Sequence, residues 1–173
     1  MALQSAEGAQ GGQNEQGAQG AQGTQPERPR VLIGKDTRRS GYMLESALAA
    51  GLTASGADAY LMHVTTTPSV AYITRMEDFA FGVMISASHN PYGDNGIKVL
   101  AASGEKLDEE TTARIEDMMD GDPRAMPYAT EAAIGCIVDY GESRSRYADY
   151  LVSLACHRFD GRKIALDCAN GGS

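Results

Sequence analysis

From residue 31 onward, short apolar runs alternate with segments in which apolar residues recur every three or four positions. The short runs are typical of buried strands and predict strands at residues 31–33, 59–64, 81–85 and 97–100. The longer periodic segments predict helices at residues 41–55, 68–75, 108–119 and 140–156. Because strands and helices alternate, we expect an α/β fold, a mixed and mostly parallel sheet flanked by helices.

Several helix boundaries and faces carry signals of their own. Gly56 is a stop signal for the first helix, and the sequence Thr-Thr-Thr-Pro at residues 65–68 combines a capping hydroxyl with a proline in the first turn of the second. The acidic run of the third helix is expected to be a solvated face and not a metal site. Its expected core contacts are Leu107, Ile115, Met118 and Met119.

The first thirty residues differ in composition from the rest. Gly, Gln and Ala dominate residues 8–25, and large apolar side chains are almost absent. Such a segment cannot bury enough apolar surface to offset the entropy lost on ordering, so we expect a disordered tail at residues 1–30. It lacks the basic start and apolar core of a secretory signal.

Charge and composition exclude several classes of partner. The formal net charge of −8 and the pI of about 4.8 argue against a nucleic-acid partner, because phosphate backbones attract basic surfaces. No apolar run approaches the roughly 20 residues that cross a bilayer, so no membrane association is expected. Three widely spaced cysteines, Cys136, Cys156 and Cys168, do not suggest zinc, and the odd count favours reduced thiols in the cytoplasm.

The strongest candidate for chemistry follows the strand at residues 81–85. This loop offers a hydroxyl nucleophile at Ser88, a rival hydroxyl at Ser86, an imidazole at His89 and, further on, an amine at Lys98. These groups suit phosphoryl or acyl transfer, and carboxyl ends of strands are where open α/β sheets bind ligands. The alternative is that the segment forms two turns with His89 exposed between them.

A second loop follows the strand at residues 31–33. Arg38 lies in it and is expected to grip a phosphate bidentately, which a lysine does less well. Lys35, Arg38 and Lys98 would together supply a local basic pocket in an acidic protein. The alternative is that Asp36 caps the next helix while the basic residues of this loop are solvated.

Two sequence blocks resemble a known family. Residues 86–91, Ser-Ala-Ser-His-Asn-Pro, together with residues 94–98, Asp-Asn-Gly-Ile-Lys, resemble the phosphoserine loop of the α-D-phosphohexomutase superfamily. Residues 34–38, Gly-Lys-Asp-Thr-Arg, and residues 40–45 are similar to its bacterial phosphoglucosamine mutase branch. The similarity runs from about residue 31 to residue 170, and residues 163–171 resemble the first strand and turn of that family's second domain.

The resemblance implies an isomerase that converts glucosamine 6-phosphate to glucosamine 1-phosphate through a phosphoserine and a bisphosphate intermediate. The reaction would serve UDP-N-acetylglucosamine and cell-wall precursor synthesis. Ser88 would carry the phosphate and, through it, bind one Mg²⁺ ion. Lys98 would transfer a proton, and His89 would contact phosphate or sugar. Arg38, Ser86 and Asn90 would bind the hexosamine phosphate.

The resemblance also implies a division of the chain. Residues 1–30 would be the tail, residues 31–157 the family's first domain without its first strand and helix, and residues 158–173 the start of its second domain. Because the family's other magnesium ligands and sugar-reading segments have no counterpart here, we expect this fragment alone to have little mutase activity. A phosphomannomutase- or phosphoglucomutase-type fragment, or a non-catalytic interaction protein, remains an alternative. No oligomeric state follows from the sequence.

Overall fold

The computed structural model describes residues 28–172, so most of the predicted tail lies outside the described part. Its centre is a five-stranded sheet with the strand order β4-β3-β1-β2-β5. The strands are β1 (Arg30–Lys35), β2 (Asp58–Val64), β3 (Phe81–Ile85), β4 (Ile97–Ala101) and β5 (Ile137–Asp139). Only the β3–β4 pair is antiparallel, so the predicted α/β fold with a mixed, mostly parallel sheet is confirmed.

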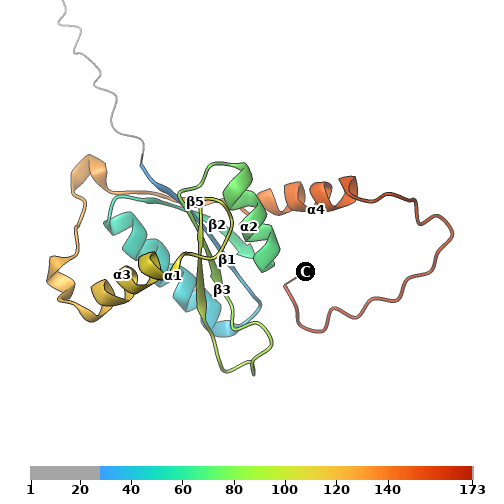
Figure 1. Ribbon diagram of the computed structural model, residues 1–173, viewed down its shortest axis with the longest axis horizontal. Coiled ribbons are helices and arrows are strands. Elements are labelled where there is room, and N and C mark those ends of the chain that lie inside the picture. Colours follow the sequence, from blue (N-terminus) through green and yellow to red (C-terminus); the bar gives the residue numbers. More distant parts are fainter. Residues whose placement is uncertain (1–27, 173) are drawn as a thin grey trace, which may run out of the picture.

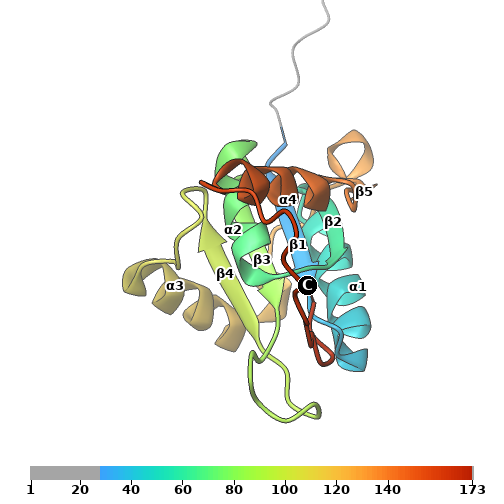
Figure 2. The same cartoon turned by 90° about the vertical axis from the view of Figure 1, so that its right-hand side faces the viewer.

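Four α-helices flank the sheet (Figures 1 and 2). They are α1 (Arg39–Ala54), α2 (Thr67–Met76), α3 (Glu109–Asp120) and α4 (Ser143–Ser153). In Figure 1, α1 and α3 lie on one side of the sheet, and α2 and α4 lie on the other. Short 3₁₀ turns at Pro123–Ala125 and Glu131–Ala133 lead from α3 to β5.

Each face of the sheet has its own core, as the alternation of side chains along β1 requires. Val31 and Ile33 face α1, where Ala49 is buried against them. Leu32 faces the other way and packs with Val70 and Ile73 of α2. At Gly34 the backbone comes so close to α2 that an added Cβ would lie 2.5 Å from Val70 Cγ2. These two cores fix the strand ends from which the candidate loops emerge.

The predicted helix signals are confirmed. The hydroxyl of Thr66 accepts a hydrogen bond from the Ser69 backbone N–H at 3.4 Å, and Pro68 lies in the first turn of α2. Gly56 follows the C-cap of α1 with a φ of 89°, a left-handed conformation that glycine adopts without strain.

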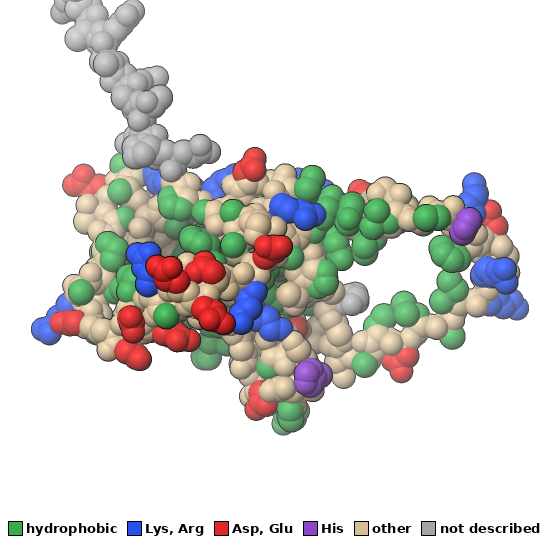
Figure 3. Space-filling view, in the orientation of Figure 1, with side chains coloured by type: hydrophobic (Ala, Val, Ile, Leu, Met, Phe, Trp, Pro, Cys, Tyr) green, Lys and Arg blue, Asp and Glu red, His purple; other side chains and the backbone are tan. Residues whose placement is uncertain are grey.

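The acidic helix α3 is only partly as predicted. None of its residues is buried, and in Figure 3 acidic side chains gather over it, as expected for a solvated face. Leu107, just before it, is buried, but Met118 and Met119 are 55% and 74% exposed. The expectation that these two methionines reach the core is therefore wrong, because α3 lies beside the β4 edge and not across the sheet (Figure 2).

Two further differences concern strands. The short strand β5 was not predicted; its pairing with β2 comes from residues 78 positions apart, as for Ala59 and Ile137. Conversely, residues 163–171, which resemble a strand and a turn, contain no strand, and no other strand among residues 28–172 pairs with them. After α4 the chain instead makes a wide arc and returns toward the sheet (Figure 1).

Candidate active site

Three loops meet at the carboxyl ends of β1, β2 and β3, because these strands run parallel and finish at the same end of the sheet. They comprise residues 36–38, 65–67 and 86–96. Together with residues 170–172 at the end of the returning arc, they line an open cleft of about 330 Å³. This volume is at the lower end of the range for small-molecule sites. The strand order also places a cleft here. β1 lies between β2 and β3, and the chain connections on its two sides lead away from it in opposite directions, which leaves a crevice at the carboxyl end of β1.

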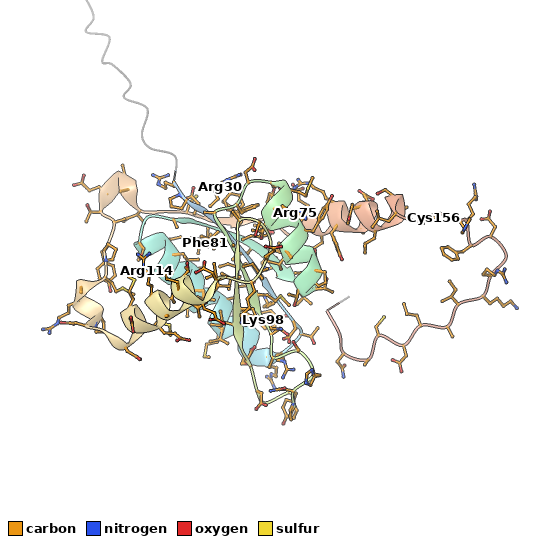
Figure 4. All side chains as sticks on the ribbon, in the orientation of Figure 1. Arg30, Arg75, Phe81, Lys98, Arg114 and Cys156 are labelled. Atoms are coloured by element: carbon orange, nitrogen blue, oxygen red, sulfur yellow. The ribbon has the colours of Figure 1, made fainter. Side chains whose placement is uncertain are left out.

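The loop at residues 86–96 joins the antiparallel strands β3 and β4. The Ser86 backbone N–H donates to the Gly96 carbonyl at 2.8 Å, which closes the base of the loop. One pair further into the sheet is Ile85 with Ile97, and Met84 then lies opposite Lys98. Figure 4 shows Lys98 on β4, at the end of the sheet from which this loop projects. The pairing of β3 and β4 therefore places Lys98 next to the base of the 86–96 loop.

Ser88 and Lys98 are in contact. Lys98 Nζ donates a hydrogen bond to Ser88 Oγ over 2.5 Å. Ser88 is exposed, and its φ of 55° places it in the left-handed region, which is uncommon for a residue with a side chain. An exposed hydroxyl with an ammonium group against its oxygen, on a constrained backbone, suits the acceptance or donation of a phosphoryl group.

Ser86 has a different environment from Ser88. It is buried, and its Oγ accepts a hydrogen bond from the Ser88 backbone N–H at 3.0 Å. The Ser86 hydroxyl also bonds to the Asp36 carboxylate. Ser86 is thus buried and engaged within the protein, which leaves Ser88 as the accessible hydroxyl of the two.

Asp36 lies under the loop and is one of the residues that sequence reasoning did not select as part of the site. Burial raises the pKa of its carboxyl, but hydrogen bonds from the Arg38 backbone N–H, the Ser86 hydroxyl and the Arg38 side chain outweigh burial. The pKa therefore lies below its usual value, and Asp36 is a carboxylate at neutral pH. It does not cap α1, whose N-cap is Arg38 without a side-chain cap bond.

Arg38 points into the 86–96 loop. Its Nε donates to Asp36 Oδ2 at 2.9 Å, and its other N–H groups donate to four backbone carbonyls. Those carbonyls belong to Ser88, Asn90, Pro91 and Asp94. A guanidinium has five N–H donors, and these five bonds use all of them. In this arrangement Arg38 therefore has no donor left for the bidentate phosphate contact that the sequence suggested.

Lys35 was expected to contribute to a basic pocket, and that expectation is wrong. Its side chain is 1% exposed and forms an ion pair with Glu45 of α1. The Lys35 ammonium also lies 4.3 Å from the centre of the Tyr42 ring. The other Glu45 oxygen lies 3.7 Å from His63 Nδ1. Lys35 therefore compensates a buried carboxylate. Of the three expected cations, Lys98 contacts the Ser88 hydroxyl and Arg38 contacts the Ser88 backbone carbonyl.

His89 and Asn90 lie at the exposed tip of the loop. The His89 imidazole makes no hydrogen bond or ion pair with any other residue of the described chain. Asn90 Nδ2 donates to Asp94 Oδ2 at 3.3 Å. Both side chains are exposed, and Asn90 is among the residues that line the cleft.

Several cleft-lining residues were not selected from the sequence: Thr65, Thr66 and Thr67 after β2, and Asn170, Gly171 and Gly172 on the returning arc. The threonines had a usable signal, since they follow a parallel strand as the other two loops do. The arc had no such signal, because its place beside the cleft depends on a contact between residues far apart in the sequence. Thr37 Oγ1 donates a hydrogen bond to the Asn170 carbonyl, 133 positions away.

Metal ligands are sparse in the described part of the chain. Residues 28–172 contain no group of three or more His, Cys, Asp and Glu side chains placed to hold a metal ion. These residues therefore do not fit a magnesium ion by themselves. No helix in the same range has the length and apolar character needed to cross a bilayer.

The sequence matches a known domain family. Residues 16–125 match the family described as phosphoglucomutase/phosphomannomutase, alpha/beta/alpha domain I. The chain is 58% identical over 146 residues to a phosphoglucosamine mutase of Lachnospira eligens, covering 84% of this chain and 32% of that protein. It is 48% identical over 147 residues to a phosphoglucosamine mutase of Bacillus subtilis, covering 85% and 33%. The chain thus spans about a third of the length of these relatives.

Two solved structures share the fold. A phosphoglucomutase/phosphomannomutase family protein from Burkholderia thailandensis superposes with a TM-score of 0.58 at 21% identity, covering 73% of this chain and 28% of that one. A putative phosphomannomutase from Thermus thermophilus gives 0.54 at 24% identity, covering 74% and 28%. At these identities the likeness concerns the fold alone.

Proposed function

The chain belongs to the phosphoglucomutase/phosphomannomutase family through its α/β/α domain I, and from this membership we propose that it carries the phosphoryl-transferring serine of a phosphoglucosamine mutase. The substrate is a hexosamine phosphate, and the reaction interconverts glucosamine 6-phosphate and glucosamine 1-phosphate. The relatives at 47–58% identity that bear this name support the choice of substrate. The chemistry is carried by one observation, the contact between Lys98 Nζ and Ser88 Oγ.

Ser88 takes part in both half-reactions. In the first half-reaction the bond between phosphorus and Ser88 Oγ breaks while phosphorus bonds to the free hydroxyl oxygen of the sugar monophosphate. The proton of that hydroxyl passes by way of Lys98 to Ser88 Oγ, so the products are a sugar bisphosphate and a neutral serine. In the second, the other phosphate of the bisphosphate moves to Ser88, and the proton returns to the departing sugar oxygen.

The neighbouring residues have supporting roles in this proposal. Asn90, which lines the cleft, and its exposed neighbour His89 at the loop tip contact phosphate or sugar. Ser86 acts through its bond to the Ser88 backbone N–H. The proposed role of the reaction in amino-sugar nucleotide and cell-wall precursor synthesis follows from the product, and the cytoplasm is the proposed location.

A magnesium ion remains a prediction from the family. The phosphate on Ser88 would be one of its ligands, and the described residues supply no set that completes its coordination. The steps above are written for the residues of this chain alone. Because the described residues complete no magnesium site, and because the chain spans a third of its relatives, we expect limited activity. The 173-residue chain alone should exchange phosphate with a bisphosphate without sustained turnover of a monophosphate.

The test is intact-mass analysis of the 173-residue protein after incubation with glucosamine 1,6-bisphosphate and MgCl₂. We expect a mass increase of one phosphate, retained in Ser86→Ala and lost in Ser88→Ala. Because the family's sugar-reading segments have no counterpart in this chain, labelling tests the role of Ser88 and not the choice of sugar. If the protein is not labelled, the non-catalytic interaction protein becomes the better explanation.

A further inference from the structure

Arg38 has an unusual set of partners for an arginine beside a candidate phosphate site. Its side chain is 9% exposed, and its guanidinium donates five hydrogen bonds, four of them to carbonyls within the seven residues 88–94. The distances to the carbonyls of Asn90, Asp94 and Ser88 are 2.8, 2.8 and 3.0 Å. The loop is thus wrapped around one cation, which neutralises the converging carbonyl dipoles.

The loop needs such a centre because its own bonds are few. Within it, the Asn90 N–H donates to the Ala87 carbonyl at 3.1 Å, and the Asp94 N–H donates to the Pro91 carbonyl at 3.0 Å. Residues 88–94 are all exposed, so no apolar burial holds their conformation. Ser88 in addition has a left-handed backbone, which for a residue with a Cβ must be stabilised by surrounding contacts.

The contacts of Arg38 and Ser86 fix Ser88 from both sides. Its N–H donates to Ser86 Oγ, and its carbonyl accepts from Arg38 Nη2. Asp36 joins the two, because its carboxylate accepts from the guanidinium and from the Ser86 hydroxyl. With both peptide groups around Ser88 held, its side chain is directed toward Lys98.

We propose that Arg38 is a positioning residue, which orders residues 88–94 and aims the Ser88 hydroxyl at Lys98, and that it is not a phosphate ligand. Only a planar fork reaches four carbonyls and a carboxylate at once, so a lysine cannot substitute. The ordering of the loop is independent of the proposed function. The effect on phosphoryl transfer rests on the proposed function.

The test compares Arg38→Ala and Arg38→Lys with Arg39→Ala, which removes the neighbouring exposed guanidinium. Hydrogen exchange is followed by NMR at the amides of Asn90 and Asp94 and, for reference, at amides of β1 and β2. We expect both Arg38 variants to exchange about 10-fold faster in the loop, with β1 and β2 within about 2-fold of the parent. Arg39→Ala should behave as the parent protein.

Chemical rescue separates positioning from a general structural effect. Millimolar N-ethylguanidinium should restore slow exchange at Asn90 and Asp94 in Arg38→Ala, where the space of the side chain is free. It should not do so in Arg38→Lys, where the amine occupies that space. Unchanged loop exchange in Arg38→Ala would overturn the proposal, and so would equal acceleration in loop and sheet.

Phosphate labelling by glucosamine 1,6-bisphosphate gives the second readout. If Arg38 positions Ser88, the maximal labelling rate of Arg38→Ala falls at least about 10-fold while the half-saturating bisphosphate concentration stays within about 2-fold. A large rise in that concentration with normal loop exchange would make Arg38 a phosphate ligand and overturn the proposal. If the parent protein is not labelled at all, the proposed function fails, and the exchange data alone decide the ordering role.

Discussion

Lys98 Nζ donates a hydrogen bond to Ser88 Oγ, although ten positions separate the two residues. The contact depends on strand pairing: β4 runs antiparallel to β3, so Lys98 returns opposite Met84 while Ser88 lies in the loop beyond. The register of the hairpin therefore brings Lys98 near the loop, and the loop conformation directs the Ser88 side chain toward it. Their proposed partnership in phosphoryl transfer gives the first prediction.

Lys98→Met should slow phosphate labelling of Ser88 by about 10²- to 10⁴-fold, the usual loss when a positioned proton-transfer group is removed. The measurement is the single-turnover labelling rate with glucosamine 1,6-bisphosphate and MgCl₂. Lys106→Met, at an exposed lysine before α3, is the matched control and should label at the parent rate. Equal rates in the two variants would remove Lys98 from the mechanism.

The buried pair of Lys35 and Glu45 makes a prediction about stability. Lys35→Met leaves the Glu45 carboxylate buried without its cation and should lower the free energy of unfolding by about 3–5 kcal/mol. The double variant Lys35→Met/Glu45→Leu should recover most of that loss, because no charge is then left unpaired. Urea denaturation measures both. A double variant as unstable as Lys35→Met would show that the lysine acts through packing.

Asp36 should make stability depend on pH below its ordinary pKa. Its pKa is lowered in the folded state, so its contribution is complete above the unfolded value of about 3.8 and is lost as the pH falls through the folded value. The stability advantage of the parent over Asp36→Asn should accordingly shrink as the pH falls below about 4. Urea midpoints across that interval test this, with Asp117→Asn on exposed α3 as the control. An advantage that grows on acidification would contradict the sign.

Gly34 and Gly51 offer a matched pair of glycine-to-alanine changes. At Gly34 a Cβ would lie 2.5 Å from Val70 Cγ2 and 2.7 Å from Thr65 Cγ2, so Gly34→Ala should destabilise by about 1–3 kcal/mol. At Gly51, in the last turn of α1, nothing lies within 4 Å of an added Cβ, and Gly51→Ala should stabilise by about 0.5–1 kcal/mol. The midpoint temperature of thermal unfolding should fall for Gly34→Ala and rise for Gly51→Ala. Similar shifts would refute the close approach of β1 and α2.

Much of the fold followed from local pattern because the signals were local. The bounds of β3 agree with the apolar run at residues 81–85, and the start of α2 agrees with the capping Thr66. The strand β5 has only three residues, and its existence depends on β2, far away in the sequence. Helical periodicity suggested buried methionines in α3, but periodicity says nothing about whether a surface is there to receive them.

The sequence pointed to Ser88 and Lys98 in the candidate site but not to the contacts around them. Sequence order placed Ser88 and Lys98 on consecutive segments, and the structure brings them into contact. Burial of Lys35 was not predictable, because a lysine enters the interior only where a partner such as Glu45 meets it. The partners of Arg38 were also hidden, since they are carbonyls, and every residue type has a carbonyl.

The left-handed backbone at Ser88 restricts which amino acid can serve as the proposed phosphate carrier there. Threonine offers the same hydroxyl oxygen, but its second substituent on Cβ makes a φ of 55° a steric outlier for a β-branched residue. Glycine and asparagine adopt this conformation easily and have no hydroxyl. Serine thus combines a hydroxyl oxygen with a side chain small enough for the turn, so the backbone, and not only the chemistry, favours serine as the proposed phosphate carrier.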